Sequence, residues 1–208
     1  MAAARIPAPP VGVVLAGGLG RRLGGDKAIV ELEGRALVLY PLEALHEVCD
    51  DVAVVAKRDT MLPPLAGVAD LWIEPDEPRH PLAGVGHALR LAAGRPVLVV
   101  AVDLPLIDAA TLRAIAATDP GGAAIVAPRV HGRLQPLCAL YTPAAMAGLA
   151  TFDPGARATD VVEAIGVREV EVDDPTAFLN VNRPEDLLQA SVLVATSSAP
   201  RQRRGQGA

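Results

Sequence analysis

Aromatic residues and long apolar runs are both scarce in this sequence. Only 2% of its 208 residues are Phe, Trp or Tyr, although 51% are hydrophobic. The core must therefore consist mainly of small aliphatic side chains, chiefly alanine and valine. No apolar run approaches the roughly 20 residues that a membrane-spanning helix requires, so the sequence predicts no membrane segment. A chain of this length is typical of one domain with a sizeable core.

Cysteine is scarce as well, because the chain contains only Cys49 and Cys138. The two residues are far apart, form no C-x-x-C pattern and have no histidine at metal-ligand spacing. This arrangement argues against the common zinc and dithiol motifs. We expect both residues to be buried thiols, as free cysteines often are.

Positive charge is not in excess either, because the chain has 19 Lys and Arg residues and 24 Asp and Glu residues, which give a net charge of −5. A dedicated nucleic-acid binder meets the phosphate backbone with a basic face, so we predict no nucleic-acid partner. Residues 1–10 are too rich in proline for a signal peptide. Arg21 and Arg22 are not followed by the long apolar segment of an export signal. We therefore expect a cytoplasmic protein.

Glycine and positive charge are concentrated in residues 11–27, VGVVLAGGLGRRLGGDK. The short, β-branched run at 11–15 predicts a strand buried on both faces. The glycines that follow let backbone N–H groups approach an anion closely. Arg21, Arg22 and Lys27 add positive charge, so the stretch predicts a phosphate-binding loop. The alternative is an ordinary glycine-rich turn with solvated basic residues.

Two common phosphate loops do not fit this stretch. A P-loop ends in G-K-[ST], whereas residues 20–27 read GRRLGGDK, with the lysine displaced and no hydroxyl after it. A dinucleotide-binding loop needs a second strand that ends in an acidic residue about 20 residues further on. The next good strand, at 51–56, is too distant and is followed by Lys57 and Arg58.

The stretch instead resembles the signature of the MobA-like nucleotidyltransferases, L-A-G-G-x-x-x-R-[ML]-G followed closely by D-K. Further segments match the family in order, and the resemblance covers about residues 11–190; these segments are PLAG at 81–84, DLP at 103–105, QPLCALY at 135–141 and FLNVNRPEDL at 178–187. The resemblance implies that a nucleotide is transferred from a nucleoside triphosphate while pyrophosphate leaves. It points most directly to members that join GMP from GTP to molybdopterin-bound molybdenum. Sugar-nucleotide and cytidylyl transferases share a looser version of the signature.

The resemblance also implies roles for individual residues. Those expected to bind the nucleotide are Leu15, Ala16, Gly17, Gly18, Arg22, Lys27, Asp76 and Asp103. Of these, Arg22, Lys27 and Asp103 are the catalytic candidates, and Asp103 is expected to hold Mg²⁺. Those expected to face the second substrate are Gln135, Asn180 and Asn182. The implied ligands are GTP and the molybdopterin cofactor, and a molybdoenzyme or a cofactor-delivery protein is the implied partner.

The residues themselves support part of this assignment. Asp103 follows the strongest predicted strand, at 96–102, and ligands of open α/β sheets bind at the carboxyl ends of strands. Mg²⁺ usually binds one or two carboxylates together with substrate phosphates. The alternative is that Asp103 caps the helix that begins near Asp108. Asn180 and Asn182 alternate onto one face of an extended segment, or else only shape a turn, and a purely structural Gln135 is an equal alternative.

Two departures from the family pattern leave alternatives open. His80 replaces the first glycine of the family's G-P-L-A-G motif, where it either narrows the pocket or points outward. Members that prefer guanine have an Asn near the end of the second strand, and residues 54–57 offer none. A cytidylyl or other nucleotidyl transferase that acts on another molybdopterin or a small phosphorylated metabolite therefore stays possible. A nucleotide-binding module without turnover is the third interpretation.

Strands and helices are predicted to alternate along the whole chain. The predicted strands cover 11–15, 51–56, 71–74, 96–102, 123–128, 134–141 and 167–172. The predicted helices cover 36–48, a weak segment interrupted by Pro63–Pro64, and segments that begin near 82, 108, 143, 159 and 184. This order predicts a doubly wound, mostly parallel α/β sheet with helices on both faces. The resemblance implies a Rossmann-like nucleotidyltransferase fold with one antiparallel strand, in a single domain at 11–194 between a flexible 1–10 and a disordered tail at 195–208.

Overall fold

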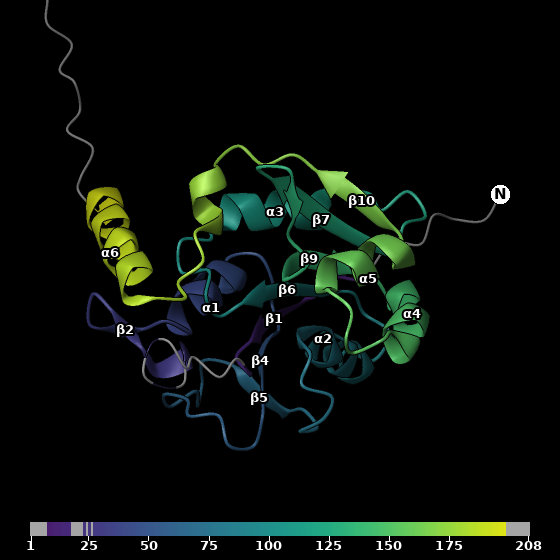
Figure 1. Ribbon diagram of the computed structural model, residues 1–208, viewed down its shortest axis with the longest axis horizontal. Coiled ribbons are helices and arrows are strands. Elements are labelled where there is room, and N and C mark those ends of the chain that lie inside the picture. The colour runs from purple at the N-terminus through teal and green to yellow at the C-terminus, as the bar shows by residue number, and fades with distance from the viewer. Residues whose placement is uncertain (1–7, 18–22, 24, 26, 199–208) are drawn as a thin grey trace, which may run out of the picture.

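A single central sheet organises the protein, as the computed structural model in Figure 1 shows for residues 8–17, 23, 25 and 27–198. The strand order is β10-β7-β9-β6-β1-β4-β5, and β8 pairs with β7. The strands are β1 (Val11–Leu15), β4 (Val52–Ala56), β5 (Asp70–Ile73), β6 (Val97–Ala101), β7 (Ile125–Val130), β8 (Arg133–Leu134), β9 (Cys138–Tyr141) and β10 (Val167–Val170). Only β9 runs antiparallel to its neighbours along this path. The predicted mostly parallel sheet is therefore confirmed, although the short β8, antiparallel to β7, adds a second antiparallel strand to the one that the resemblance implies.

Strand β1 lies in the middle of the sheet because it is apolar on both faces. It pairs in parallel with β4 and β6, and all five of its residues are buried. Because side chains alternate along a strand, Val14 enters one core cluster, while Val13 and Leu15 enter the other. Gly12 allows the neighbouring helix to approach closely, since a Cβ there would lie 3.2 Å from the side chain of Leu45.

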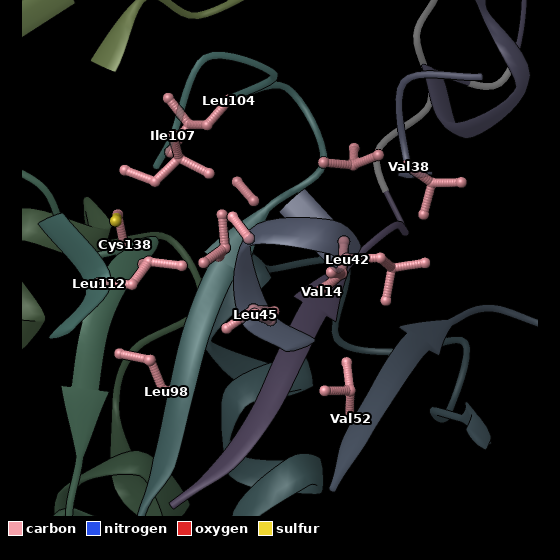
Figure 2. Close-up of a cluster of buried hydrophobic side chains, with 14 of the residues drawn as sticks. Val14, Val38, Leu42, Leu45, Val52, Leu98, Leu104, Ile107, Leu112 and Cys138 are labelled. Carbon is pink, nitrogen blue, oxygen red and sulfur yellow. The ribbon is translucent and has the colours of Figure 1, made fainter. Parts of the chain in front are cut away.

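Helices cover both faces of the sheet. Helices α1 (Leu39–His46) and α3 (Ala109–Ala117) pack on one face, and α2 (Pro81–Leu91), α4 (Met146–Thr151) and α5 (Ala158–Ile165) pack on the other. Figure 2 shows the cluster of the first face, in which Leu42 and Leu45 of α1 and Leu112 of α3 meet Val14 and Leu98 of the sheet. Full burial of each such leucine contributes about 2 kcal/mol.

The last helix, α6 (Pro184–Ser198), lies at the side of the sheet next to β2 (Glu31–Leu32) and β3 (Arg35–Ala36), as Figure 1 shows. A small third cluster holds it there, formed by Leu32, Leu37, Val181 and Ala190. The helix continues to Ser198, so the first four residues of the predicted tail at 195–208 are helical and not disordered. The remainder of that tail lies outside the described residues.

Three predicted helices differ from the observed ones. The first spans Leu39–His46 and not 36–48, and Pro41 occupies its first turn, where a proline costs little. No helix forms in residues 57–69, all of which the structure describes, because Pro63 and Pro64 supply no N–H groups. Helix α5 begins at Ala158, one residue before the predicted start near 159, and the side chain of Arg157 at its N-cap makes no capping hydrogen bond.

The two cysteines are buried and free, as the sequence predicts. Burial raises the pKa of the Cys49 thiol to about 11 and also raises the pKa of Cys138 well above its usual range. Both side chains are therefore protonated and act as small apolar groups. Among the described residues, no helix has the length and apolar character needed to cross a membrane.

Candidate active site

A cavity of about 320 Å³ opens where the central strands β1, β4, β5 and β6 end. Its walls include Leu15 and Gly17 after β1, Lys57 after β4, Glu74 after β5 and Asp103 after β6. The carboxyl ends of the strands in an open α/β sheet are where ligands bind. The sheet thus brings Gly17, the first glycine of the predicted loop, and the predicted metal-binding aspartate to one cavity.

Lys27 joins three distant parts of the chain in this cavity. Its Nζ donates to Asp103 Oδ2 at 2.7 Å and to Asn182 Oδ1 at 2.5 Å. The side chains of Lys27 and Asp103 are only 13% and 18% exposed, so solvent screens this ion pair weakly. A lysine ammonium has three N–H donors. Two are used here, and one remains for a ligand in the cavity.

The alternative capping role of Asp103 is excluded by the structure. Asp108 caps α3, since its Oδ1 accepts a hydrogen bond from the Thr111 N–H at 2.7 Å. The backbone carbonyl of Asp103 accepts from the Val181 N–H at 2.9 Å, which fixes the segment that carries Asn182 beside the end of β6. The Asp103 carboxylate is therefore free to face the cavity.

The cavity contains a second ion pair, between Lys57 and Glu74, which was not predicted from the sequence. The two side chains are each only 8% exposed, and Lys57 Nζ lies 3.5 Å from Glu74 Oε1. Lys57 Nζ also donates to the Pro75 carbonyl at 2.7 Å. Burial raises the pKa of Glu74, and the nearby Lys57 charge opposes that rise. The available signal was a charged residue directly after each of two short strands, VAVVA-K and DLWI-E.

Two glycines of the family motifs provide the space for the Glu74 carboxylate. A Cβ on Gly17 would lie 2.6 Å from Glu74 Oε1, and a Cβ on Gly84 would lie 3.0 Å from Glu74 Oε2. A side chain at position 17 would therefore force the carboxylate to move, and one at position 84 would press tightly against it. Asp76, the predicted nucleotide-binding acid, is instead exposed and does not line the cavity.

His80 lines the cavity and does not simply point outward. Its Nδ1 accepts from the Leu82 N–H at 3.2 Å, so it caps α2, and its Nε2 lies 3.2 Å from the Ala156 carbonyl. Its ring also lies 4.8 Å from the Phe152 ring. The side chain thus occupies space that a glycine would leave open, and it fastens the start of α2 to residues 152–156.

The other loop residues of the nucleotide prediction are placed in different ways. Leu15 and Gly17 line the cavity. Ala16 is fully buried, and its N–H donates to the Val55 carbonyl at 2.8 Å, so it has no amide free for a phosphate. Gly18 and Arg22 lie outside the described residues.

The predicted second-substrate residues separate into two places. Asn182 contacts Lys27 beside the first cavity. Gln135 and Asn180 instead line a second cavity of about 640 Å³. The Asn180 Nδ2 donates to the Phe178 carbonyl at 3.1 Å. Asn180 therefore lines the second cavity, whereas Asn182 is placed by its contact with Lys27, a residue of the first.

The donor set fits a metal that is held largely by its substrate. Asp103 offers a carboxylate to the cavity, and the described residues contain no group of three or more His, Cys, Asp and Glu side chains that could form a complete metal cage. Mg²⁺ bound through one or two carboxylates plus substrate phosphates requires no such cage. Asp103 is therefore the residue that would hold Mg²⁺ here.

Comparisons with known proteins agree with this geometry. The family model described as MobA-like NTP transferase domain matches residues 12–170. A molybdenum cofactor guanylyltransferase from Cereibacter sphaeroides is 35% identical over 189 residues, which cover 88% of this chain and 96% of the relative.

Solved structures show the same fold. A molybdopterin-guanine dinucleotide biosynthesis protein A from Archaeoglobus fulgidus has a TM-score of 0.74 at 24% identity, covering 89% of this chain and 99% of that one. A 2-C-methyl-D-erythritol 4-phosphate cytidylyltransferase from Thermus thermophilus has a TM-score of 0.66 at 22% identity, with the same coverage of 89% and 99%. The fold is therefore shared by nucleotidyltransferases with different substrates. The motifs, the cavity at the strand ends and the match over most of the sequence show that the chain belongs to the family of MobA-like NTP transferases.

Proposed function

We propose that the protein transfers GMP from GTP to the molybdopterin-bound molybdenum cofactor and releases pyrophosphate. The observation that carries this proposal is the contact of Lys27 with Asp103 and Asn182 at the carboxyl ends of the sheet. Relatives that match most of this chain are named molybdenum cofactor guanylyltransferases, which supports the choice of donor and acceptor.

The reaction requires a new bond at the α-phosphorus of the triphosphate. An oxygen of the acceptor's phosphate forms a bond to this phosphorus while the bond to the β-phosphate bridging oxygen breaks. Pyrophosphate leaves with the electron pair, and GMP stays joined to the acceptor through a diphosphate. Charge on the phosphates is the main obstacle, so catalysis depends on positioning and neutralisation.

Lys27 supplies that neutralisation from this chain. Its free N–H can donate to the triphosphate while the other two remain on Asp103 and Asn182. The ammonium is then held by two fixed partners and needs no rearrangement as charge develops. Asp103 would hold Mg²⁺, and the bound ion would add positive charge beside the phosphates. We also assign Arg22 to the triphosphate, as the family resemblance implies.

The nucleoside end of GTP would lie toward Lys57 and Glu74. From β6, the strand of Asp103, the sheet passes β1 and β4 to reach β5, the strand of Glu74. The Glu74 side chain reaches back toward β1, since its Oε1 lies 2.6 Å from the position of a Cβ on Gly17, so both carboxylates line the same cavity. We therefore assign the role of the nucleotide-binding acid to Glu74 and not to Asp76.

Guanine is the base that this pair suits best. A carboxylate such as that of Glu74 can accept both N–H groups of guanine's N1 and N2 edge, and the ammonium of Lys57 can donate to O6. Cytosine offers one amino donor beside a ring acceptor, so it satisfies the carboxylate less fully. The pair thus replaces the Asn that is missing from residues 54–57.

The test is a pyrophosphate-release assay with molybdenum-loaded molybdopterin as acceptor, together with chromatographic detection of the dinucleotide product. We expect turnover with GTP that exceeds turnover with CTP or ATP. Preferred use of CTP would overturn guanine recognition and favour a cytidylyl transferase of the same fold. Tight GTP binding without pyrophosphate release would instead indicate a nucleotide-binding module without turnover.

A further inference from the structure

The backbone of Asn182 is held by the first turn of α6, which begins two residues later at Pro184. Within that turn, the Oδ2 atom of Asp186 accepts a hydrogen bond from the Asn182 N–H and a second from the Arg183 N–H, each at 2.9 Å. An acidic side chain in the first turn of a helix often reaches back in this way to the preceding amides. The positive end of the helix dipole also favours a carboxylate there. Asp186 therefore fixes the peptide units through which the chain enters α6.

Asn182 carries this fixed position to the nucleotide cavity. Its Oδ1 accepts from Lys27 Nζ at 2.5 Å, and Lys27 Nζ also donates to Asp103 Oδ2 at 2.7 Å. A lysine side chain is long and has many rotamers, so its ammonium keeps one direction only where several fixed groups bind it. The hydrogen bonds thus form a continuous path from Asp186 through Asn182 to Lys27.

The chain that follows Lys27 rests on the same helix, which Figure 1 shows beside β2. Leu32 of β2 packs with Ala190 of α6 in the third cluster. The Ser191 hydroxyl, one residue further along α6, donates to the carboxylate of Glu33 in the turn between β2 and β3. Helix α6 is therefore attached to both chain segments whose side chains meet at the Lys27 ammonium.

Asp186 itself stands back from the expected substrates. It is half-buried at the helix start and is not among the described residues that line the nucleotide cavity. Glu185, the other acid of the same turn, is exposed, and the amides of residues 182 and 183 donate to Asp186 instead. The first turn of α6 thus contains one carboxylate that binds the Asn182 peptide and one that adds charge without binding it.

We propose that Asp186 is a positioning residue of the transfer reaction, and that it acts through Asn182 to set the direction of the Lys27 ammonium. This inference rests on the proposed nucleotidyl transfer, in which Lys27 donates its third N–H to the triphosphate. Without the Asp186 carboxylate, the chain before α6 gains freedom, and the Asn182 amide no longer holds Lys27 in one direction. The charge of Lys27 stays in the cavity, so the loss is one of orientation and not of charge.

The experiment measures pyrophosphate release from GTP by the full chain, with molybdenum-loaded molybdopterin as acceptor, for Asp186→Ala, Asn182→Ala and the double variant. Asp186→Ala should lower kcat/KM for GTP about tenfold, because a small displacement of a positioned group slows the reaction. The double variant should lose no more than Asn182→Ala alone, since both changes break the same path. Urea unfolding gives the folded fraction of each variant, and the rates are referred to folded protein.

Two further variants separate positioning from charge and from helix stability. Asp186→Asn keeps a side-chain oxygen that can accept from the two amides, so it should retain kcat/KM for GTP within about threefold of the wild-type value. Glu185→Ala is the matched control, because it removes a negative charge from the same turn and leaves the Asp186 contacts in place. It should leave kcat/KM for GTP unchanged.

Three results would overturn this role while the transfer itself stands. The first is an Asp186→Ala protein with the wild-type kcat/KM for GTP. The second is a double variant whose loss is the product of the two single losses, about a hundredfold, which would show that the two residues act independently. The third is a loss in Glu185→Ala, or in Asp186→Asn, equal to that in Asp186→Ala, since charge at the helix start would then explain the effect. Wild-type protein that releases no pyrophosphate would overturn the proposed function, and this role with it.

Discussion

The nucleotide cavity contains two lysine–carboxylate pairs that differ in how tightly the protein holds them. Lys27 and Asp103 are in direct contact at 2.7 Å and are 13% and 18% exposed. Lys57 and Glu74 are 3.5 Å apart, each 8% exposed, and Lys57 is bound to a backbone carbonyl as well. Asp103, Lys57 and Glu74 each follow a strand of the same sheet, whereas Lys27 begins a short 3₁₀ helix at Lys27–Ile29. The first pair retains more exposed surface than the second.

This difference separates a pair suited to catalysis from a pair suited to recognition. A partly exposed pair can exchange or share its contacts with an anion at modest cost. The more deeply buried pair has already lost most of its contact with water, and this burial raises the pKa of Glu74. Gly17 and Gly84 lie close against the Glu74 carboxylate and limit its movement. We therefore expect changes in the first pair to affect turnover and changes in the second to affect stability and base choice.

The largest effect should come from Asp103→Ala. It should lower kcat by about 10³-fold or more, because the positive charge at the phosphates loses its anchor. The melting temperature should stay near the wild-type value, since the Asp103 backbone contact to Val181 is kept. Pyrophosphate release and differential scanning fluorimetry measure the two quantities.

Asp108→Ala is the matched control for this variant. Asp108 caps α3 and lies in the same loop region as Asp103. Its loss should destabilise the protein by about 1 kcal/mol and leave kcat nearly unchanged. Turnover by the Asp103→Ala protein at the wild-type rate would refute the assignment of the first pair.

Lys27→Met should lower kcat/KM for GTP by about 10²-fold, since it removes one preorganised donor to the phosphates. Asn182→Ala should have a smaller effect, because it removes an orienting contact of Lys27 and leaves the charge in place. Steady-state kinetics with varied GTP distinguish the two variants. If Lys27→Met and Asn182→Ala lowered kcat/KM for GTP equally, Lys27 would act only through its hydrogen bond to Asn182.

Gly17→Ala should destabilise the protein by about 1–3 kcal/mol, because its Cβ would lie 2.6 Å from Glu74 Oε1. The double variant with Glu74→Ala should recover much of that loss, since the clashing carboxylate is gone. Urea unfolding of both single variants and the double variant gives the coupling energy. Additive effects would mean that Gly17 is needed for a reason unrelated to Glu74.

The smallest effect should be on the pH dependence of the unfolding free energy, to which Glu74 contributes. Because burial raises the folded-state pKa of Glu74, the folded state holds its proton more tightly than the unfolded state does. The contribution of Glu74 to stability should therefore fall as the pH rises from its unfolded pKa of about 4.3 through the raised folded value.

Glu74→Gln removes this titration. The unfolding free energy of the wild type relative to Glu74→Gln should fall with rising pH over that interval, as measured by urea unfolding at several pH values. A difference that grows with rising pH would show that pairing with Lys57 outweighs the desolvation. The ratio of GTP to CTP turnover should also fall in Glu74→Gln, because one acceptor for the guanine N–H donors is lost.

The fold could be predicted from the sequence because its strands are short apolar runs with clear ends. The run VGVVL became β1 with the predicted bounds, and VLVVA became β6 to within one or two residues. The weak helix predicted around Pro63 and Pro64 is wrong, because neither proline has an N–H group to donate to a helical hydrogen bond. In such a short segment, two prolines are enough to override the helix propensity of the other residues.

The site was only partly predictable, because some of its contacts depend on strand order. Lys27 and Asp103 belong to family motifs, one in the loop after β1 and one after β6, so a common location at the carboxyl edge of the sheet could be predicted. Lys57 and Glu74 lie 17 positions apart in sequence and meet because β4 and β5 pair in parallel, so that both residues follow the same end of the sheet. Asp76 matched the motif position by its residue type, yet the chain turns outward after Glu74 and leaves Asp76 exposed.

The contact of Lys27 with Asn182 joins residues that are 155 positions apart in the chain. During synthesis, Lys27 emerges early, and its second partner is made only when the domain is almost complete. The second partner of Lys27 is therefore made only after β10, the last strand of the described sheet. A chain released before Asn182 would contain all the strands of the described sheet together with Asp103, but its Lys27 would lack one of its two hydrogen-bond partners.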